Sequence, residues 1–333
     1  MQLTGRRSAT KTSAGLATMR LSPKSVPPPL VFHEDYSIPW PEKHRFPMWK
    51  YQGLADYLVQ EGDVVASRMD FARPHDEAPH EQTLLCHDAE YYWAFLQDRL
   101  APEMLRRSGF AQRPDHGLLV RAWRLGIAGT VLAARLALKC GVAGNLWGGT
   151  HHAHRAWGSG YNVFNDLAIA ARVLIQEGTV RRVSIVDLDV HQGDGTAEIF
   201  LDDPQVFTFS MHCGDNFPFG FKGLPYLGQD VSDLDVPLPR NTGDAEFLSA
   251  LRQNLPAALE PTPDLVLYNA GVDVHRDDEL GRFTISDSGL ALRDRYVVTE
   301  CFQRRGIPVA FVLGGGYTHK DRKTLARRHA TAC

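Results

Sequence analysis

The stretch Val183–His191, with the sequence VSIVDLDVH, indicates both a fold class and a site. Its first four residues, Val183–Val186, are mostly β-branched, as expected for a strand that is buried on both faces of a sheet. Asp187, Asp189 and His191 alternate with apolar residues, so in extended backbone their side chains lie on one face. Three polar groups on a buried strand are costly unless something pairs with them, and a cation would do so. The stretch therefore predicts a core strand that leads into a ligand site.

Similar apolar runs recur along the chain and predict further strands. They are Leu30–Phe32, Val206–Phe209, Leu265–Tyr268 and Val309–Leu313. Helices are expected between them, for example one that Asn165 or Asp166 caps and that runs to Gly178. The alternation predicts an α/β fold, a single three-layer α/β/α domain with a central, mostly parallel sheet. In such sheets ligands bind beyond the carboxyl ends of the strands, so the chemistry is expected there.

The composition of the 333 residues is that of a globular protein that buries a large core. Hydrophobic residues make up 44% and charged residues 23%, and the formal net charge is −3. This charge gives no field that holds nucleic acid, so direct binding of DNA or RNA is not expected. No apolar run reaches the roughly 20 residues of a membrane span. The five cysteines are scattered without a C-x-x-C pair, which argues against a disulfide framework and favours a reducing compartment.

Residues 1–28 differ from the rest of the chain, and the domain is expected to span residues 29–333. The stretch Met1–His33 has no acidic residue, and its arginines and lysines stand among many Ser and Thr. That composition is typical of an organellar transit peptide, and the alternatives are a disordered tail or an over-extended start. We expect a cytoplasmic protein, or a mitochondrial or plastid protein if the segment is a transit peptide.

The run Asp187–His191 has the composition of a catalytic metal site. One imidazole nitrogen with carboxylate oxygens and an open position for water suits Zn²⁺, with Fe²⁺ as the alternative. Asp273 follows the predicted strand Leu265–Tyr268 and is a candidate third ligand beside Asp189 and His191. The competing interpretation is that these side chains only cap loops or pair with arginines.

Two adjacent histidines, His151 and His152, lie in the glycine-framed segment GGTHHAH. Imidazoles suit acid–base chemistry because their pKa lies near neutrality, and a carboxylate partner can fix their tautomer and basicity. Asp187 and Asp194 are the candidate partners. A structural role is the alternative for the pair, and it is the interpretation adopted for His154.

The segment Gly314–Tyr317, with the sequence GGGY, follows the last predicted strand. Three glycines let the backbone approach a site closely, and Tyr317 can then offer its hydroxyl to a reacting carbonyl oxygen. A phosphate-binding loop is the alternative for such a segment, but neither G-x-x-x-x-G-K-[ST] nor G-x-G-x-x-G is present.

Taken together and in this order, these motifs resemble the histone deacetylase family, which has the arginase–deacetylase fold, and most of all its class IV, bacterial-type branch. The resemblance covers roughly residues 30–330. The segments that carry it are His44–Met48, Gly148–Ala153, Gly158–Asp166, Ile185–Thr196, Thr208–His212, Asn269–Asp273, Leu313–Tyr317 and Arg327–His329. It implies a metal-dependent deacetylase or deacylase that hydrolyses the amide of an acyl-lysine in a histone or another protein.

The resemblance also implies a role for each residue of the site. Asp189, His191 and Asp273 correspond to the metal ligands. His152 corresponds to the general base that activates the attacking water and then protonates the leaving amine. His151 corresponds to its largely electrostatic partner.

Three further side chains complete the implied machinery. By the resemblance, Asp187 orients His151 and Asp194 orients His152. Tyr317 donates a hydrogen bond to the substrate carbonyl as it becomes an oxyanion. Such a preorganised donor contributes roughly 3 kcal/mol to transition-state stabilisation.

The resemblance places a substrate tunnel and a second cation near the site. Gly160, Tyr161 and Phe217 correspond to tunnel residues, and Arg45 resembles an arginine near the acetate-release cavity of the family. A structural K⁺ or Na⁺ is implied at residues that contribute largely backbone oxygens, namely Asp187, Asp189, His191, Ser210 and Met211. Core packing is the alternative role for the aromatic residues, and a salt bridge is the alternative for Arg45.

The substrate remains open between two alternatives on the same fold, an acyl-lysine protein and an acetylpolyamine or other small acylated amine. An arginase-type site is disfavoured because no D-x-H-x-D pattern is present. A non-catalytic binding scaffold is disfavoured because every implied ligand and the tyrosine are present. The segment Phe217–Asp230 is longer than the usual connection of the family and is expected to border the tunnel.

Overall fold

A computed structural model describes residues 27–333 except 62–64, 114, 219–231, 261 and 319–320. Within these residues, seven strands form one sheet in the order β1-β2-β7-β6-β3-β4-β5, and every pairing is parallel. The strands are β1 Leu30–Val31, β2 Val142–Asn145, β3 Val183–Asp187, β4 Val206–Cys213, β5 Leu234–Leu238, β6 Leu265–Asn269 and β7 Val309–Val312. The predicted α/β class is therefore confirmed.

Five of these strands coincide with the apolar runs of the sequence, whereas β2 and β5 were not predicted. The sequence of β2 is VAGN, and a Cβ added at Gly144 would lie 2.1 Å from the ring of Phe311, so packing against β7 requires the glycine. β5 is an edge strand, which can accommodate Pro237 because one side of its backbone is unpaired. Neither strand has the continuous β-branched pattern of a doubly buried strand.

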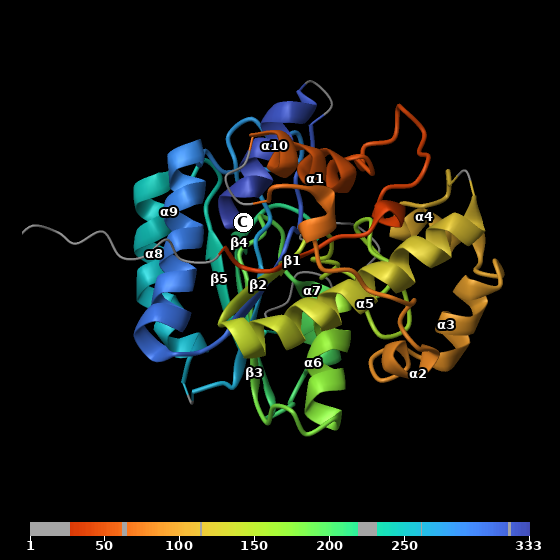
Figure 1. Cartoon of the computed structure of the whole chain (residues 1–333), viewed down its shortest axis with the longest axis horizontal. Coiled ribbons are helices and arrows are strands. Elements are labelled where there is room, and N and C mark those ends of the chain that lie inside the picture. The colour runs from red at the N-terminus through yellow and green to blue at the C-terminus, as the bar shows by residue number, and fades with distance from the viewer. Residues whose placement is uncertain (1–26, 62–64, 114, 219–231, 261, 319–320) are drawn as a thin grey trace, which may run out of the picture.

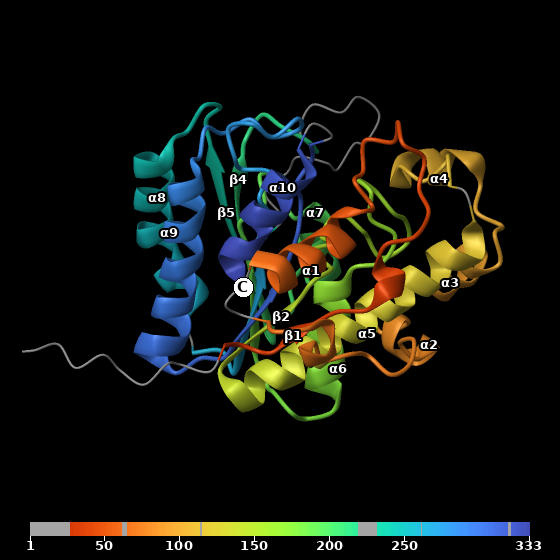
Figure 2. The same ribbon diagram turned by 45° about the horizontal axis from the view of Figure 1, so that its top comes forward.

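Helices cover both faces of the sheet, with α8 and α9 on one side and α5 and α6 on the other (Figures 1 and 2). The helices are α1 Lys50–Glu61, α2 His80–Thr83, α3 Ala89–Leu96, α4 Pro102–Ser108, α5 His116–Cys140, α6 Asp166–Gln176, α7 Asp194–Ile199, α8 Asp244–Ala258, α9 Asp287–Val298 and α10 Arg322–His329. The side chain of Asn165 caps α6 as predicted, accepting a hydrogen bond from the backbone N–H of Ala168 at 3.0 Å. α6 ends at Gln176, two residues before Gly178, which has φ +67°.

One helix within the described residues, α5, is long and apolar enough to cross a membrane by length and composition alone. It packs along β2 and β7, and 61% of its most apolar window is buried inside the molecule. Its apolar character is thus accounted for by the core of the fold, where Leu119, Trp123 and Ile127 are buried.

The carboxyl ends of the neighbouring strands β3, β6 and β7 meet at one edge of the sheet. Asp187, the last residue of β3, is in register with Asn269 of β6 and with Ser210 of β4. Asn269 is in register with Val312, the last residue of β7. The loops that follow these strands therefore begin at the same level, which brings three segments distant in sequence to one place.

Candidate active site

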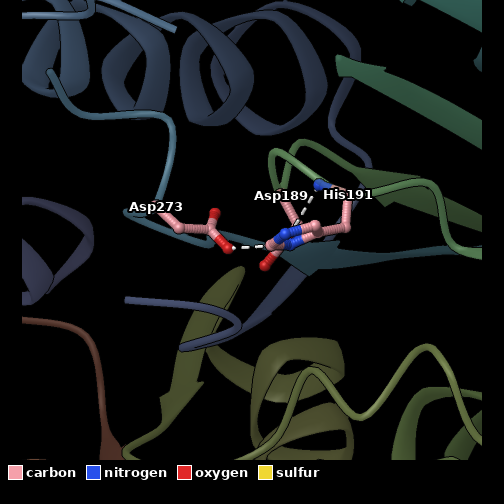
Figure 3. A group of neighbouring side chains, drawn as sticks. All are labelled: Asp189, His191 and Asp273. Atoms are coloured by element: carbon pink, nitrogen blue, oxygen red, sulfur yellow. Dashed lines mark hydrogen bonds and ion pairs between the residues drawn. The ribbon is translucent and has the colours of Figure 1, made fainter. Parts of the chain in front are cut away.

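Three side chains that could hold a metal ion meet just beyond the ends of β3 and β6 (Figure 3). Asp189 and His191 lie in the loop after β3, not in the strand, because β3 ends at Asp187. Asp273 reaches them from the loop after β6. Nδ1 of His191 lies 3.0 Å from Oδ1 of Asp189 and 3.1 Å from Oδ2 of Asp273, and all three side chains are buried.

This cluster fits a divalent cation. Backbone N–H groups hold one oxygen of each carboxylate: Gly315 donates to Asp189 at 2.6 Å, and Val190 donates to Asp273 at 3.0 Å. Oδ2 of Asp273 is buried, and among the described residues no donor reaches it with hydrogen-bond geometry, although Nδ1 of His191 lies 3.1 Å away. Burial, reinforced by the negative charge of Asp189, raises the pKa of Asp273 to about 6. Two buried carboxylates and one imidazole form a donor set that suits Zn²⁺ or Fe²⁺.

Glycines make room for the cluster. A Cβ at Gly271 would lie 2.3 Å from Oδ2 of Asp189, and one at Gly315 would lie 1.9 Å from Oδ2 of Asp273. Both distances are far below van der Waals contact, so any larger residue would displace a ligand. The glycines of the GGGY segment thus allow the backbone to approach the carboxylates, as predicted.

The two adjacent histidines each bond a different carboxylate beside this cluster. Nδ1 of His151 lies 2.6 Å from Oδ2 of Asp187, and Nδ1 of His152 lies 2.6 Å from Oδ1 of Asp194. The two rings are 4.0 Å apart, and the ring of His152 is 5.7 Å from that of His191. Both pairings are those that the resemblance implied.

The same surroundings push the two imidazoles toward opposite protonation states. Burial opposes a charge on His151, but the carboxylates of Asp187 and Asp189 outweigh it and raise its pKa to about 9. Burial and the adjacent His151 together lower the pKa of His152 to about 4, although Asp194 opposes this shift. At neutral pH, His151 is therefore charged and His152 is free to accept a proton.

His154 shares Asp194 with His152. Its Nε2 lies 3.1 Å from Oδ2 of that carboxylate, and its ring stacks on Trp157 with centroids 3.7 Å apart. His154 does not line the pocket and supports the carboxylate from behind. This placement agrees with the structural role adopted for it.

Tyr317 borders the cluster from the glycine-rich segment after β7. Its ring centroid is 6.4 Å from that of His191 and 6.0 Å from that of Tyr161. Burial and the nearby carboxylates, Asp273 first among them, raise its pKa well above the ordinary value, so its hydroxyl stays protonated. A neutral phenol beside the cluster can donate a hydrogen bond to a carbonyl oxygen.

A pocket of about 350 Å³ leads from the surface to this site. It brings together the predicted tunnel residues with the histidines and the tyrosine, since its walls include Arg45, His152, Gly160, Tyr161, His191, Phe217 and Tyr317. The ring of Phe217 stands edge to face with His152 at 4.7 Å. Gly160 has φ +53°, and a Cβ there would lie 2.4 Å from the His152 ring, so the wall requires glycine at this point. Most of Phe217–Asp230 lies outside the described residues.

The residues of the implied K⁺ or Na⁺ site are adjacent, but the structure tests only their placement. Asp187 and Ser210 are paired across β3 and β4, and Met211 follows Ser210. Oδ1 of Asp187 accepts hydrogen bonds from the Asn269 side chain at 3.0 Å and from the Asp189 backbone at 3.1 Å. The monovalent site remains a prediction.

Arg45 lines the pocket and is exposed, whereas another cation, Lys50, is buried beneath the site. Nζ of Lys50, the first residue of α1, donates to the carbonyl oxygen of Gly314 at 2.7 Å. Burial lowers its pKa to about 8, although Asp273 and Asp189 oppose the shift. Arg45 thus lies in the pocket wall with the other predicted tunnel residues, and its place near an acetate-release cavity stays a prediction. Lys50 lies two residues beyond the segment His44–Met48, whose resemblance was the available signal.

Asp278 is a second residue that the sequence analysis missed. One of its oxygens accepts a hydrogen bond from the backbone N–H of Tyr317 at 2.7 Å, and the other accepts from Leu280 and Gly281 at 2.8 Å each. Asp278 thereby ties the loop after β6 to the segment that carries Tyr317. In the sequence it lies within the acidic run Asp277–Glu279, which looks like an exposed turn, so no local pattern marked it.

Comparisons with known proteins point to one family. Residues 44–333 match the model of the histone deacetylase domain. The chain is 44% identical to an uncharacterised protein of Picosynechococcus, over 91% of this chain and 96% of that protein. It is 32% identical to histone deacetylase 2 of Arabidopsis thaliana, over 89% of this chain and 76% of that protein.

Solved structures show the same fold. The crystal structure of a histone deacetylase homologue, determined with SAHA, superposes with a TM-score of 0.73 at 25% identity, over 92% of this chain and 84% of that chain. The HD domain of HDA15 superposes with a TM-score of 0.69 at 21% identity, over 91% and 89% of the two chains. With the family match spanning most of its length, this chain belongs to the histone deacetylase family.

Proposed function

We propose that this protein hydrolyses the amide bond of an acyl-lysine, with a divalent ion held by Asp189, His191 and Asp273. The observation that carries the proposal is the meeting of this ligand cluster with two His–Asp pairs and a buried tyrosine at the end of one pocket. Zn²⁺ is the proposed ion, with Fe²⁺ as the alternative, and a structural K⁺ or Na⁺ is proposed behind it. When bound, the divalent ion polarises the substrate carbonyl and lowers the pKa of water toward 7.

His152 is the proposed general base. Its Nδ1 is held by Asp194, so Nε2 is the nitrogen available to take the proton of the attacking water. Burial and His151 lower its pKa to about 4, which keeps it unprotonated before the reaction. His152 then passes this proton to the nitrogen of the leaving lysine amine, which regenerates the unprotonated base.

His151 and Tyr317 are proposed to stabilise the charge that develops on the carbonyl oxygen. Asp187 and Asp189 raise the pKa of His151 to about 9 against the effect of burial, so it acts as a fixed positive charge at neutral pH. Tyr317 contributes a neutral hydroxyl donor, which is positioned through the bond between its backbone and Asp278. Fixed donors and charges cost no reorganisation during the reaction.

The pocket is suited to a slender aliphatic chain that ends in an acyl group. Gly160 lets the wall close up against His152, and Phe217 and Tyr161 present aromatic surfaces beside it. An extended lysine side chain can place its amide at the His152 end while the peptide backbone stays outside.

The proposal is tested by measuring hydrolysis of an Nε-acetyl-lysine peptide before and after chelation and re-addition of Zn²⁺ or Fe²⁺. We expect chelated protein to be inactive and one of the two ions to restore activity at one ion per chain. Asp76→Ala, an exposed aspartate outside the site, serves as the control for Asp189→Ala. Full activity in protein shown to be metal-free would refute the proposed function.

A further inference from the structure

Four arginines border the mouth of the active-site pocket: Arg45, Arg106, Arg107 and Arg282. They come from three separate parts of the chain. Arg45 lies between β1 and α1, Arg106 and Arg107 lie in the last turn of α4, and Arg282 lies in the loop between β6 and α9. All four are exposed, and the described residues that line the pocket include no Asp or Glu.

Most of this positive charge has no carboxylate partner in the part of the chain that the structure describes. Arg106 pairs with Glu103 at 2.6 Å, but Arg45, Arg107 and Arg282 have no carboxylate within ion-pair distance among the described residues. The guanidinium of Arg107 lies over the ring of Trp157 at 4.6 Å, and Arg282 donates to the backbone carbonyl of Gly281 at 3.2 Å. Neither contact neutralises a charge. The whole chain has a formal net charge of −3, so the positive mouth runs against its overall balance.

Charge of one sign around a pocket raises the local concentration of ligands of the opposite sign and disfavours ligands of the same sign. The pocket runs from these arginines to His152 and Tyr317. A substrate whose amide reaches the inner end therefore has its remaining parts beside the arginines. The mouth should favour substrates with carboxylates next to the acylated lysine.

We propose that the arginine mouth, defined as Arg45, Arg106, Arg107 and Arg282, selects acyl-lysine within acidic peptide sequences. This inference rests on the proposed function. Arginines from three segments can meet carboxylates on both sides of the lysine, which suits a peptide better than a small molecule with a single carboxylate. An acetylpolyamine carries ammonium groups beyond its amide, and the mouth would repel them.

Matched peptides test the selection directly. One peptide has acetyl-lysine between pairs of Asp, and the other has it between pairs of Asn, which keeps shape and removes charge. We expect kcat/KM of the wild-type protein to be about tenfold higher for the Asp peptide at low salt, since an exposed ion pair contributes roughly a threefold effect. The preference should shrink as salt screens the charges.

The variant Arg107→Gln/Arg282→Gln should reduce this Asp-to-Asn ratio by about tenfold. Arg181→Gln is the matched control, because Arg181 is exposed and precedes β3 at the opposite end from the site. It should keep the wild-type ratio. Equal rates on the two peptides, or an unchanged ratio in the double variant, would overturn the proposal.

Two further experiments complete the test. The first compares the Asp peptide with small acylated amines, and the second measures peptide binding separately from hydrolysis. Free Nε-acetyl-lysine as good as the Asp peptide, or an acetylated polyamine better than it, would contradict selection of acidic sequences. Binding of labelled Asp and Asn peptides, followed by fluorescence anisotropy, gives a readout without turnover. If no peptide is hydrolysed but the Asp peptide binds more tightly and loses that advantage in the double variant, the proposed function fails and the selection stands.

Discussion

In the described part of the chain, charged side chains are paired at the inner end of the pocket and mostly unpaired at its mouth. At the inner end, Asp187 pairs with His151, Asp194 pairs with His152, and His191 lies between Asp189 and Asp273. At the mouth, three of the four arginines have no carboxylate partner among the described residues. Burial is the difference, because an unpaired charge inside a protein costs several kcal/mol whereas an exposed one costs little. The paired side chains at the inner end hold one another in fixed positions, whereas the unpaired arginines at the mouth are free to contact a substrate.

The largest expected effect comes from breaking the paired end at the metal cluster. Asp189→Ala removes one proposed ligand and one of the two carboxylates that pair with His191. Loss of a residue that only supports a ligand lowers metal affinity by up to roughly 100-fold, so loss of the ligand itself should cost more. We expect hydrolysis to fall to background. Elemental analysis together with peptide assays checks both. A variant that keeps one ion per chain and normal turnover would remove Asp189 from the ligand set.

Removing the imidazoles one at a time tests their different protonation states. We expect His152→Ala to lower kcat by roughly 10²–10⁴-fold, because it removes the base, and His151→Ala to lower it less. Both variants should retain the metal, which separates this effect from loss of the cluster. If matched assays give the reverse order, the roles of the two histidines are exchanged.

Tyr317→Phe removes a hydroxyl and leaves the ring and its packing. We expect kcat to fall by about 10²–10³-fold with the metal retained, since one oxyanion donor is lost. Single-turnover kinetics separate this effect from altered substrate binding. Wild-type rates in this variant would show that Tyr317 takes no part in the chemistry.

The dependence of kcat on pH tests the charge of His151 at the paired end, and the expected effect is smaller. Because its carboxylate partners raise the pKa of His151 to about 9, its charge is present below that pH and is lost as the pH rises through it. We therefore expect kcat to decline several-fold on the alkaline side of pH 9. The decline should be absent in His151→Ala and present in Tyr317→Phe, because the pKa of Tyr317 lies well above 10. If kcat of His151→Ala declined above pH 9 as it does in the wild-type protein, the decline would belong to another group.

At the mouth, single arginines are expected to matter least, about threefold each, and only for charged substrates. The expected effects of these substitutions thus decrease from the buried cluster to the exposed mouth. A large effect of Arg107→Gln on the Asn peptide would mean that the mouth contributes to the chemistry itself, and the contrast between the two ends would fail.

Much of the fold and of the paired end could be predicted from local patterns. Val183–Val186 reads as a buried strand because β-branched residues pack well on a pleated sheet. Asp189 and His191 lie three and five residues beyond Val186, the end of this predicted strand, so their closeness to each other is set by the local chain. Asp273 follows another predicted strand, and parallel strands place their carboxyl ends together.

The amino-acid sequence by itself determined the α/β class, the ligand cluster and the histidine pair, because each depends on residues close in sequence or at the ends of parallel strands. Only the tertiary structure decided that Lys50 lies beneath Gly314, that Asp278 holds the backbone of Tyr317, and that the arginines gather at one opening. Those contacts join residues from separate elements, and no periodicity encodes which surface loops meet. Side-chain packing across the finished sheet brings them together.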